Sequence, residues 1–201
     1  MCPGGVVINA ASEPGGVVTN GMSWSGRAGR NANSALLVSV SPADFPCPGP
    51  LGGLEWQRQL ERRAFEYAGG GYLAPAQLVS DFLAGRASDG PGRVEPSIKP
   101  GVYWGDLRRV LPGLVTESMA EALPLLGRKL RGFDSGDAVL TGPETRSSSP
   151  VRIPRDKGCC SAVRGLYPCG EGAGWAGGIT SAAVDGMRCA EAVIAAVEAG
   201  K

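Results

Sequence analysis

Apolar residues recur at steps of three and four along three stretches of the chain, which is the period of one face of a helix. Residues 54–68 and 113–131 carry the pattern in the middle of the sequence, and Pro124 is expected to kink or divide the second stretch. Residues 179–198 repeat most regularly and predict a long helix. Shorter helices are predicted over residues 74–84 and after Asp106, a plausible N-cap.

Short apolar runs bounded by glycine and proline turns predict strands on either side of this helical middle. The candidate strands are residues 6–10, 17–19, 35–40, 138–141, 151–153 and 165–170. The run at 35–40, ALLVSV, is expected to be a buried strand. The order of elements predicts an α/β fold of α+β character. Residues 1–53 would form a strand-rich part, 54–136 an inserted helical lobe, and 137–201 the closing strands and a strand–turn–helix.

The composition excludes several classes of function. The 201 residues carry 20 basic and 19 acidic side chains, a net charge of +1, so neither a nucleic acid nor a membrane surface is an expected partner. The absence of histidine excludes Ser-His-Asp and Cys-His catalysis and every His-ligated metal site. Six cysteines without a CxxC pair predict no metal site and a soluble protein of the reducing cytoplasm. The neighbouring Cys159 and Cys160 are either two ordinary thiols or a vicinal disulfide.

Residues 172–177, GAGWAG, match the pattern GxGxxG between a candidate strand and the last helix. A dinucleotide fold needs a further strand after that helix, but helix fills nearly all the remaining residues, so the motif closes a fold. It can still bind a cofactor, because glycines admit a flat ring close to the backbone and the helix N-terminus offers unpaired N–H groups. Glu171 could accept hydrogen bonds from sugar-type hydroxyls. The alternative is a turn that only tightens helix packing.

Residues 165–193, GLYPCGEGAGWAGGITSAAVDGMRCAEAV, resemble the C-terminal flavin-contacting motif of FAD-dependent oxidoreductases. MCPGGVVINAASE, VVTNGMS, NANSALLV, AGGGYLAPAQLVSDFL and LTGPETRSSSPVRI extend the resemblance over nearly the whole chain. They resemble the C-terminal portion of an uncharacterised family of bacterial FAD-utilising dehydrogenases. The resemblance implies part of a FAD/NAD(P)-binding fold, with FAD as cofactor and hydride transfer to or from a small-molecule substrate of unknown identity.

The resemblance places Glu171 on the ribityl chain of FAD, and Gly178 and Ile179 beside the pyrimidine edge of the flavin. The cofactor-binding residues it implies are Gly170, Glu171, Gly172, Ala173, Gly174, Gly177, Gly178, Ile179, Cys2, Pro3, Gly4, Gly5 and Arg146. Residues 2–5 could equally be a turn that starts a strand, and Arg146 could belong to a solvated polar connection. Trp175, inside the glycine turn, could cover the cofactor. No catalytic residue is identified.

Families of this kind begin with a glycine-rich βαβ unit that binds the ADP half of FAD, and residues 1–40 contain no such motif. The expectation is a C-terminal fragment or split subunit that binds FAD weakly or not at all until an N-terminal FAD-binding half completes it. The alternative function is a non-catalytic fragment that needs this partner to fold. The small-residue face of the last helix (Ala182, Ala183, Gly186 and Ala190) is expected to pack on a sheet partly supplied by the missing half.

Overall fold

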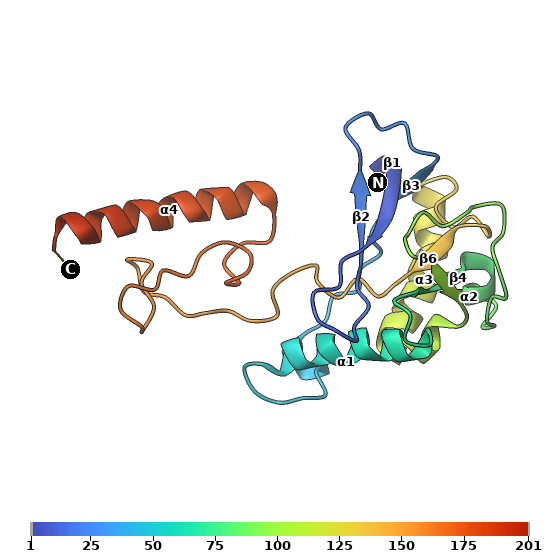
Figure 1. Ribbon diagram of the computed structural model, residues 1–201, viewed down its shortest axis with the longest axis horizontal. Coiled ribbons are helices and arrows are strands. Elements are labelled where there is room, and N and C mark those ends of the chain that lie inside the picture. The colour runs from blue at the N-terminus through green and yellow to red at the C-terminus, as the bar shows by residue number, and fades with distance from the viewer. Residues whose placement is uncertain (1, 201) are drawn as a thin grey trace. The chain divides into compact units, whose positions relative to one another are not determined.

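The computed structural model describes residues 2–200 and is shown in Figure 1. The chain divides into two compact units, each built from two separate segments. The first unit comprises Met1–Ser41 and Gln57–Thr145, and the second comprises Pro42–Trp56 and Arg146–Lys201. Within residues 2–200, four α-helices and two small sheets confirm the mixed α and β composition expected from the sequence.

The first sheet of the first unit is antiparallel, in the order β2-β1-β3. Strand β1 (Cys2–Asn9) pairs with β2 (Thr19–Ser23) on one side and with β3 (Asn31–Asn33) on the other. The register between β1 and β3 shifts between Cys2 and Gly5. Gly4 lies at this irregularity with φ +65°, where a side chain would overlap the backbone of Arg27.

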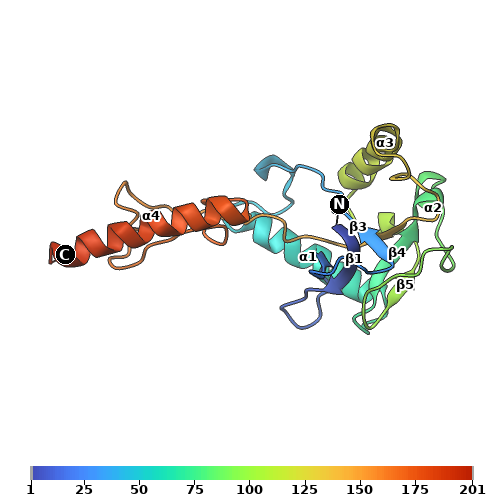
Figure 2. The ribbon, with the colours of Figure 1, turned by 90° about the horizontal axis from the view of Figure 1, so that it is seen from above.

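The second sheet has the order β5-β4-β6 and lies beside α2 and α3 in Figures 1 and 2. Strand β4 (Ala74–Leu78) pairs in parallel with β5 (Val102–Trp104) and antiparallel with β6 (Val139–Thr141). Because β4 is central, its first four residues are buried. Two apolar clusters flank it, one around Val17, Ala64, Ala74, Ile98 and Val110, the other around Val79, Phe82, Met119 and Leu123.

The long helices form where the apolar period predicts them. They are α1 (Gly52–Tyr67), α3 (Gly113–Lys129) and α4 (Ile179–Glu198). α3 continues through Pro124, so of the two predicted effects of this proline, a kink or a division, the division is wrong. Asp106 is the predicted N-cap: its carboxylate accepts the Arg108 N–H at 3.0 Å and opens a short 3₁₀ helix, η2 (Leu107–Arg109). A second 3₁₀ helix, η1 (Pro42–Asp44), precedes α1.

The helix predicted over residues 74–84 is wrong in its first half. Ala74–Leu78 is strand β4, and helix α2 occupies only Val79–Leu83. The apolar run APAQL is short and has proline at its second position, and pairing with β5 and β6 on both sides buries it as a strand. Local periodicity could not reveal these partners, because they lie more than twenty residues away in the sequence.

Three of the predicted strands are also wrong, and of the strand predicted over residues 17–19 only Thr19 lies in one, β2. Residues 35–40, 151–153 and 165–170 are irregular in the structure. In the first run, Leu36 and Val38 pack against the Phe82 cluster, whereas Leu37 is 54% exposed. The inside–outside alternation of a strand is therefore present without a neighbouring strand to pair with it.

Candidate functional site

The glycine turn at residues 170–175 lies in the second unit and is closed by its own backbone. The Trp175 N–H donates to the Gly170 carbonyl at 3.0 Å, and the Gly174 N–H donates to the Glu171 carbonyl at 2.9 Å. Gly170 and Gly174 adopt φ +70° and +77°, which favours glycine. A side chain on Gly174 would also overlap the Val151 carbonyl oxygen and the Arg152 backbone. These two glycines are therefore required by the turn itself.

Asp185, on the second turn of α4, anchors this loop to the helix. Its Oδ2 accepts the Gly170 N–H at 2.9 Å, and its two oxygens accept the Arg155 guanidinium at 2.5 and 3.0 Å. The hydrogen bonds from Arg155, followed by that from Gly170, lower the pKa of Asp185 to about 2. Arg155 also donates to the Pro168 carbonyl at 2.7 Å. One ion pair thus holds three segments of the unit together.

Two guanidinium groups lie over the Trp175 ring. The Arg155 carbon is 4.0 Å and the Arg152 carbon 4.7 Å from its ring centre, and the indole N–H donates to the Ile153 carbonyl at 2.9 Å. Cation–π contacts with both arginines therefore fix the ring. The Trp175 indole, which the sequence suggested could cover a cofactor, packs on the Arg152 and Arg155 side chains in the described chain.

Beyond the turn, the backbone at the start of α4 is open. Gly178, the residue before the helix, is extended, and its carbonyl accepts the Ala182 N–H at 2.8 Å and the Ser181 hydroxyl at 3.0 Å. The first N–H groups of a helix have no partner within it and lie at the positive end of its dipole. A side chain built on Gly172 or Gly177 would meet no described atom within 4 Å. This stretch can therefore admit a planar or anionic group.

The predicted site residues fall in both units. Residues 170–174, 177–179 and Arg146 belong to the second unit, and the structure brings 170–174 together in one turn that leads to α4. Glu171 and Arg146 are exposed, whereas Ala173 is 7% exposed and packs inside the unit. Cys2, Pro3, Gly4 and Gly5 start strand β1 in the first unit. The Pro3 carbonyl there accepts the Ser23 hydroxyl at 2.8 Å, and the Cys2 side chain lies outside the described part of the chain.

The small-residue face of α4, expected to pack on a sheet partly supplied by the missing half, is partly exposed among the described residues, and its packing on such a sheet stays a prediction. Ala183 and Ala190 are exposed, and a side chain on Gly186 would meet none of the described atoms within 4 Å. The buried positions of α4 are Asp185 and Cys189, one turn apart. The side of α4 that packs within this unit does so through the ion pair between Asp185 and Arg155.

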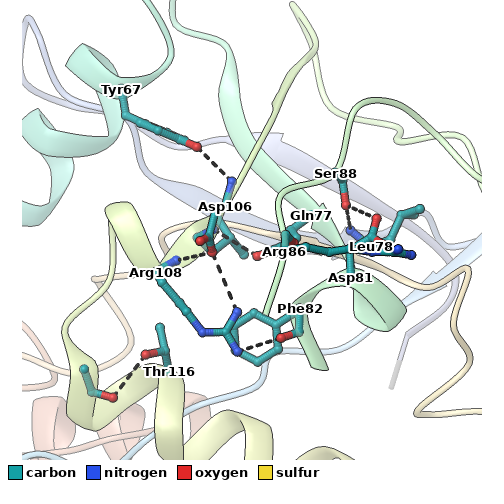
Figure 3. Close-up of polar contacts among 12 residues, drawn as sticks. Tyr67, Gln77, Leu78, Asp81, Phe82, Arg86, Ser88, Asp106, Arg108 and Thr116 are labelled. Carbon is teal, nitrogen blue, oxygen red and sulfur yellow. Dashed lines mark hydrogen bonds and ion pairs between the residues drawn. The ribbon is translucent and has the colours of Figure 1, made fainter. Parts of the chain in front are cut away.

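A polar network inside the first unit was missed by the sequence analysis and is drawn in Figure 3. Gln77 of β4 is fully buried; its side-chain oxygen accepts the Leu107 N–H at 2.9 Å, and its amide donates to the Arg86 carbonyl at 2.7 Å. Asp81 accepts the Ser88 hydroxyl at 2.6 Å and the Arg86 guanidinium at 2.7 Å, and these bonds lower its pKa. The only sequence signal was a glutamine inside an apolar strand.

Most polar groups of the network are paired within it; the exception is Arg108 Nη1, which has no hydrogen-bond partner among the described residues and lies 3.7 Å from the Asp106 carboxylate. The Ser88 hydroxyl accepts the Leu78 N–H at 2.9 Å, and the Tyr67 hydroxyl accepts the Asp106 N–H at 2.8 Å (Figure 3). Arg108 donates to the Phe82 carbonyl at 2.6 Å and stacks 4.4 Å from the Phe82 ring centre. These contacts join β4, α2, η2 and the end of α1, so they position the sheet and offer no reactive group.

Two further observations concern metal binding and membrane crossing. Among residues 2–200, no group of three or more Asp, Glu or Cys side chains could hold a metal ion. Within the same residues, none of the helices combines the length and apolar character that a membrane crossing requires.

Two comparisons with known proteins bear on the family of this chain. A protein of Clostridium beijerinckii, described as uncharacterized, is 51% identical over 195 residues, which is 96% of this chain and 37% of that protein. The chain thus spans little more than a third of the length of this relative. The family model described as FAD-dependent protein, C-terminal domain-like, matches residues 1–147. Because that match covers well over half of the sequence, the chain belongs to this family of FAD-dependent proteins.

Proposed function

We propose that this chain is the flavin- and substrate-side part of an FAD-dependent oxidoreductase that acts on a small-molecule substrate. Bound FAD would supply the chemistry, the transfer of a hydride between the substrate and the flavin ring. The observation that carries the proposal is the anchored glycine turn that leads into the open N-terminus of α4. Membership of the FAD-dependent family supports it.

The residues of this turn fit a flavin. Gly172 and Gly177 leave space beside the backbone, where a flat ring could approach. The N–H groups at the start of α4, from Ile179 onward, would donate to the pyrimidine edge, and the helix dipole would stabilise negative charge there. Glu171 is exposed at the turn and would accept hydrogen bonds from ribityl hydroxyls.

The role of Asp185 in this proposal is to hold the turn in place. Its carboxylate binds both the Gly170 N–H and the Arg155 guanidinium, so the turn cannot move relative to α4 without breaking a largely buried ion pair. A preorganised backbone costs no rearrangement when the cofactor binds. Asp185 is therefore a positioning residue.

A second candidate function, a fragment that needs an N-terminal partner to fold and bind FAD, is favoured by the outer face of α4. Val184, Met187, Ile194 and Val197 recur at helical spacing and are 42–71% exposed. Apolar rows of this kind usually pack against protein. The much greater length of the Clostridium relative supports a further part of the protein as the occupant.

One experiment distinguishes the two candidate functions. The chain is purified alone and also joined to the part of the Clostridium relative outside the matched region, and FAD binding is followed by flavin absorbance after gel filtration. We expect little FAD with the chain alone and retained FAD with the joined form. Retained FAD with the chain alone would overturn the need for a partner. Loss of FAD from both forms, with the joined form folded, would overturn the flavin proposal.

A further inference from the structure

Strand β2 lies at one edge of the antiparallel sheet of the first unit (Figure 1). At its start, the Thr19 N–H donates to the Pro143 carbonyl at 2.8 Å and therefore points away from β1. The direction of the backbone groups along a strand repeats every two residues, so the N–H groups of Gly21 and Ser23 point the same way.

The neighbouring strand agrees with this pattern. Val7 of β1 lies opposite Gly21, and its N–H donates to the Ser97 hydroxyl at 2.8 Å, on the side of β1 away from β2. Val7 and Gly21 are therefore a pair without hydrogen bonds between them, whereas the adjacent pair of Val6 and Met22 is hydrogen-bonded. The backbone N–H and carbonyl of Gly21 thus face the outer edge of the sheet.

The chain covers one edge of this sheet and leaves the other open. Beside β3, the Asn31 side-chain amide donates to the Glu95 carbonyl at 2.8 Å, so residues 95–97 lie along that edge. Beside β2, by contrast, no segment among residues 2–200 bonds to the outward backbone groups of Gly21 or Ser23. These groups are therefore available to pair with another strand.

The open edge lacks the features that keep edge strands from pairing. Natural edges are commonly protected by charged side chains, by proline or by a bulge. Residues 19–24, TNGMSW, contain neither a charged residue nor a proline, and the register of β2 with β1 is unbroken over five pairs. Met22 and Trp24 are 51% and 72% exposed. Free backbone groups beside exposed apolar side chains are typical of an edge that accepts an added strand.

Side-chain contacts hold β2 in place before any partner binds. The Asn33 side-chain amide, on β3, donates to the Val6 carbonyl at 2.8 Å and to the Met22 carbonyl at 3.0 Å. The Ser23 hydroxyl donates to the Pro3 carbonyl at 2.8 Å. A strand already fixed in its paired conformation loses little conformational freedom when another strand binds to it.

We propose that β2 accepts an extended segment as a fourth strand of this sheet, and that the segment belongs to the part of the protein that the Clostridium relative has outside the matched region. The match covers only 37% of that relative, so the remaining part is long enough to supply a strand. The inference rests on the second candidate function, in which a further part of the protein binds this chain, and adds where and how that part binds. Main-chain hydrogen bonds to Gly21 and Ser23 would hold the segment, and Met22 and Trp24 would pack against its side chains.

The test is amide hydrogen exchange, read residue by residue, in the chain alone and in the form joined to the remaining part of the Clostridium relative. In the chain alone, the N–H groups of Gly21 and Ser23 should exchange fast, and those of Asn20 and Met22, which face β1, slowly. In the joined form, exchange at Gly21 and Ser23 should slow by at least about tenfold. Met22→Lys places a charge at the edge and should restore fast exchange there, whereas Leu114→Lys, a similarly exposed position on α3, should not.

The outcomes separate this inference from the flavin proposal. Equal exchange at Gly21 and Ser23 in both forms, with the joined form folded, would overturn the added strand even if FAD is retained. Slowed exchange in a joined form that retains no FAD would support the strand and overturn the flavin proposal. Slow exchange in the chain alone that depends on its concentration would make a second copy the occupant and contradict the inference. The comparison of the two unmodified forms decides the question if a variant fails to fold.

Discussion

Arg155 and Asp185 form a two-point ion pair, with guanidinium nitrogens 2.5 and 3.0 Å from the two carboxylate oxygens. The pair joins an irregular loop to the second turn of α4, and both side chains are about one-tenth exposed. The same carboxylate also accepts the Gly170 N–H. A single residue of α4 therefore determines where the glycine turn lies relative to that helix.

Acid should weaken the second unit through Asp185. Its pKa of about 2 in the folded chain lies below the ordinary value of 3.8, so its contribution is complete above about pH 4 and is lost as the pH falls toward 2. In Asp185→Asn, the unfolding temperature should be lower at neutral pH and fall less between pH 4 and 2. Glu191→Gln, an exposed change on α4, is the matched control. An unchanged acid dependence in Asp185→Asn would contradict this assignment.

Substitution by alanine should destabilise the protein at Gly174 and have little effect at Gly172. Gly174→Ala places a side chain at φ +77° against the Val151 carbonyl, and the conformation alone costs about 1–2 kcal/mol. Gly172→Ala, with nothing described within 4 Å of the new atom, should change the free energy of unfolding by less than about 0.5 kcal/mol. Denaturant unfolding measures both. Equal losses in the two variants would show that the turn is not held as described.

Gln77→Leu should destabilise the first unit by about 1–3 kcal/mol for each polar group it leaves unpaired. The change removes the partners of the Leu107 N–H and the Arg86 carbonyl. Glu117→Leu, an exposed position on α3, is the control for adding an apolar side chain. Chemical denaturation followed by circular dichroism is the measurement, and a Gln77→Leu chain as stable as its control would refute the role of the network.

The substitution Glu171→Ala should weaken the binding of FAD to the form of the protein that retains it. Loss of a charged hydrogen bond to a hydroxyl costs about 1.5–3 kcal/mol, roughly ten- to hundredfold in Kd. Glu117→Ala removes the same charge from an exposed position on α3 and should leave Kd unaltered. Fluorescence titration of the flavin gives both values. Equal affinities would remove Glu171 from the site.

The outer face of α4 should bind a hydrophobic dye when the chain is alone. Met187 and Ile194 are 65% and 57% exposed, and apolar rows on a helix are rarely left uncovered in a complete protein. Met187→Glu with Ile194→Glu should lower dye fluorescence and reduce FAD retention in the joined form. A chain that binds no dye and melts cooperatively as a monomer would show that this face needs no partner.

The local sequence pattern was sufficient to predict those features that depend on residues close together in the sequence. The bounds of α4 follow from twenty residues of regular period, and the Asp106 cap follows from one side chain and the backbone two residues on. The glycine turn was equally visible, because Gly170 and Gly174 are the residues that tolerate positive φ. Each of these features is decided within a few residues of the chain.

Tertiary structure decided what depends on distant partners. Ala74–Leu78 became a strand because residues 102–104 and 139–141 pair with it, and residues 35–40 stayed irregular without such a partner. Asp185 acquired its role only when the fold brought Arg155 to it across thirty residues. Ion pairs and strand pairing are made between segments whose spacing in the sequence carries no period, and only the folded chain determines which of them meet.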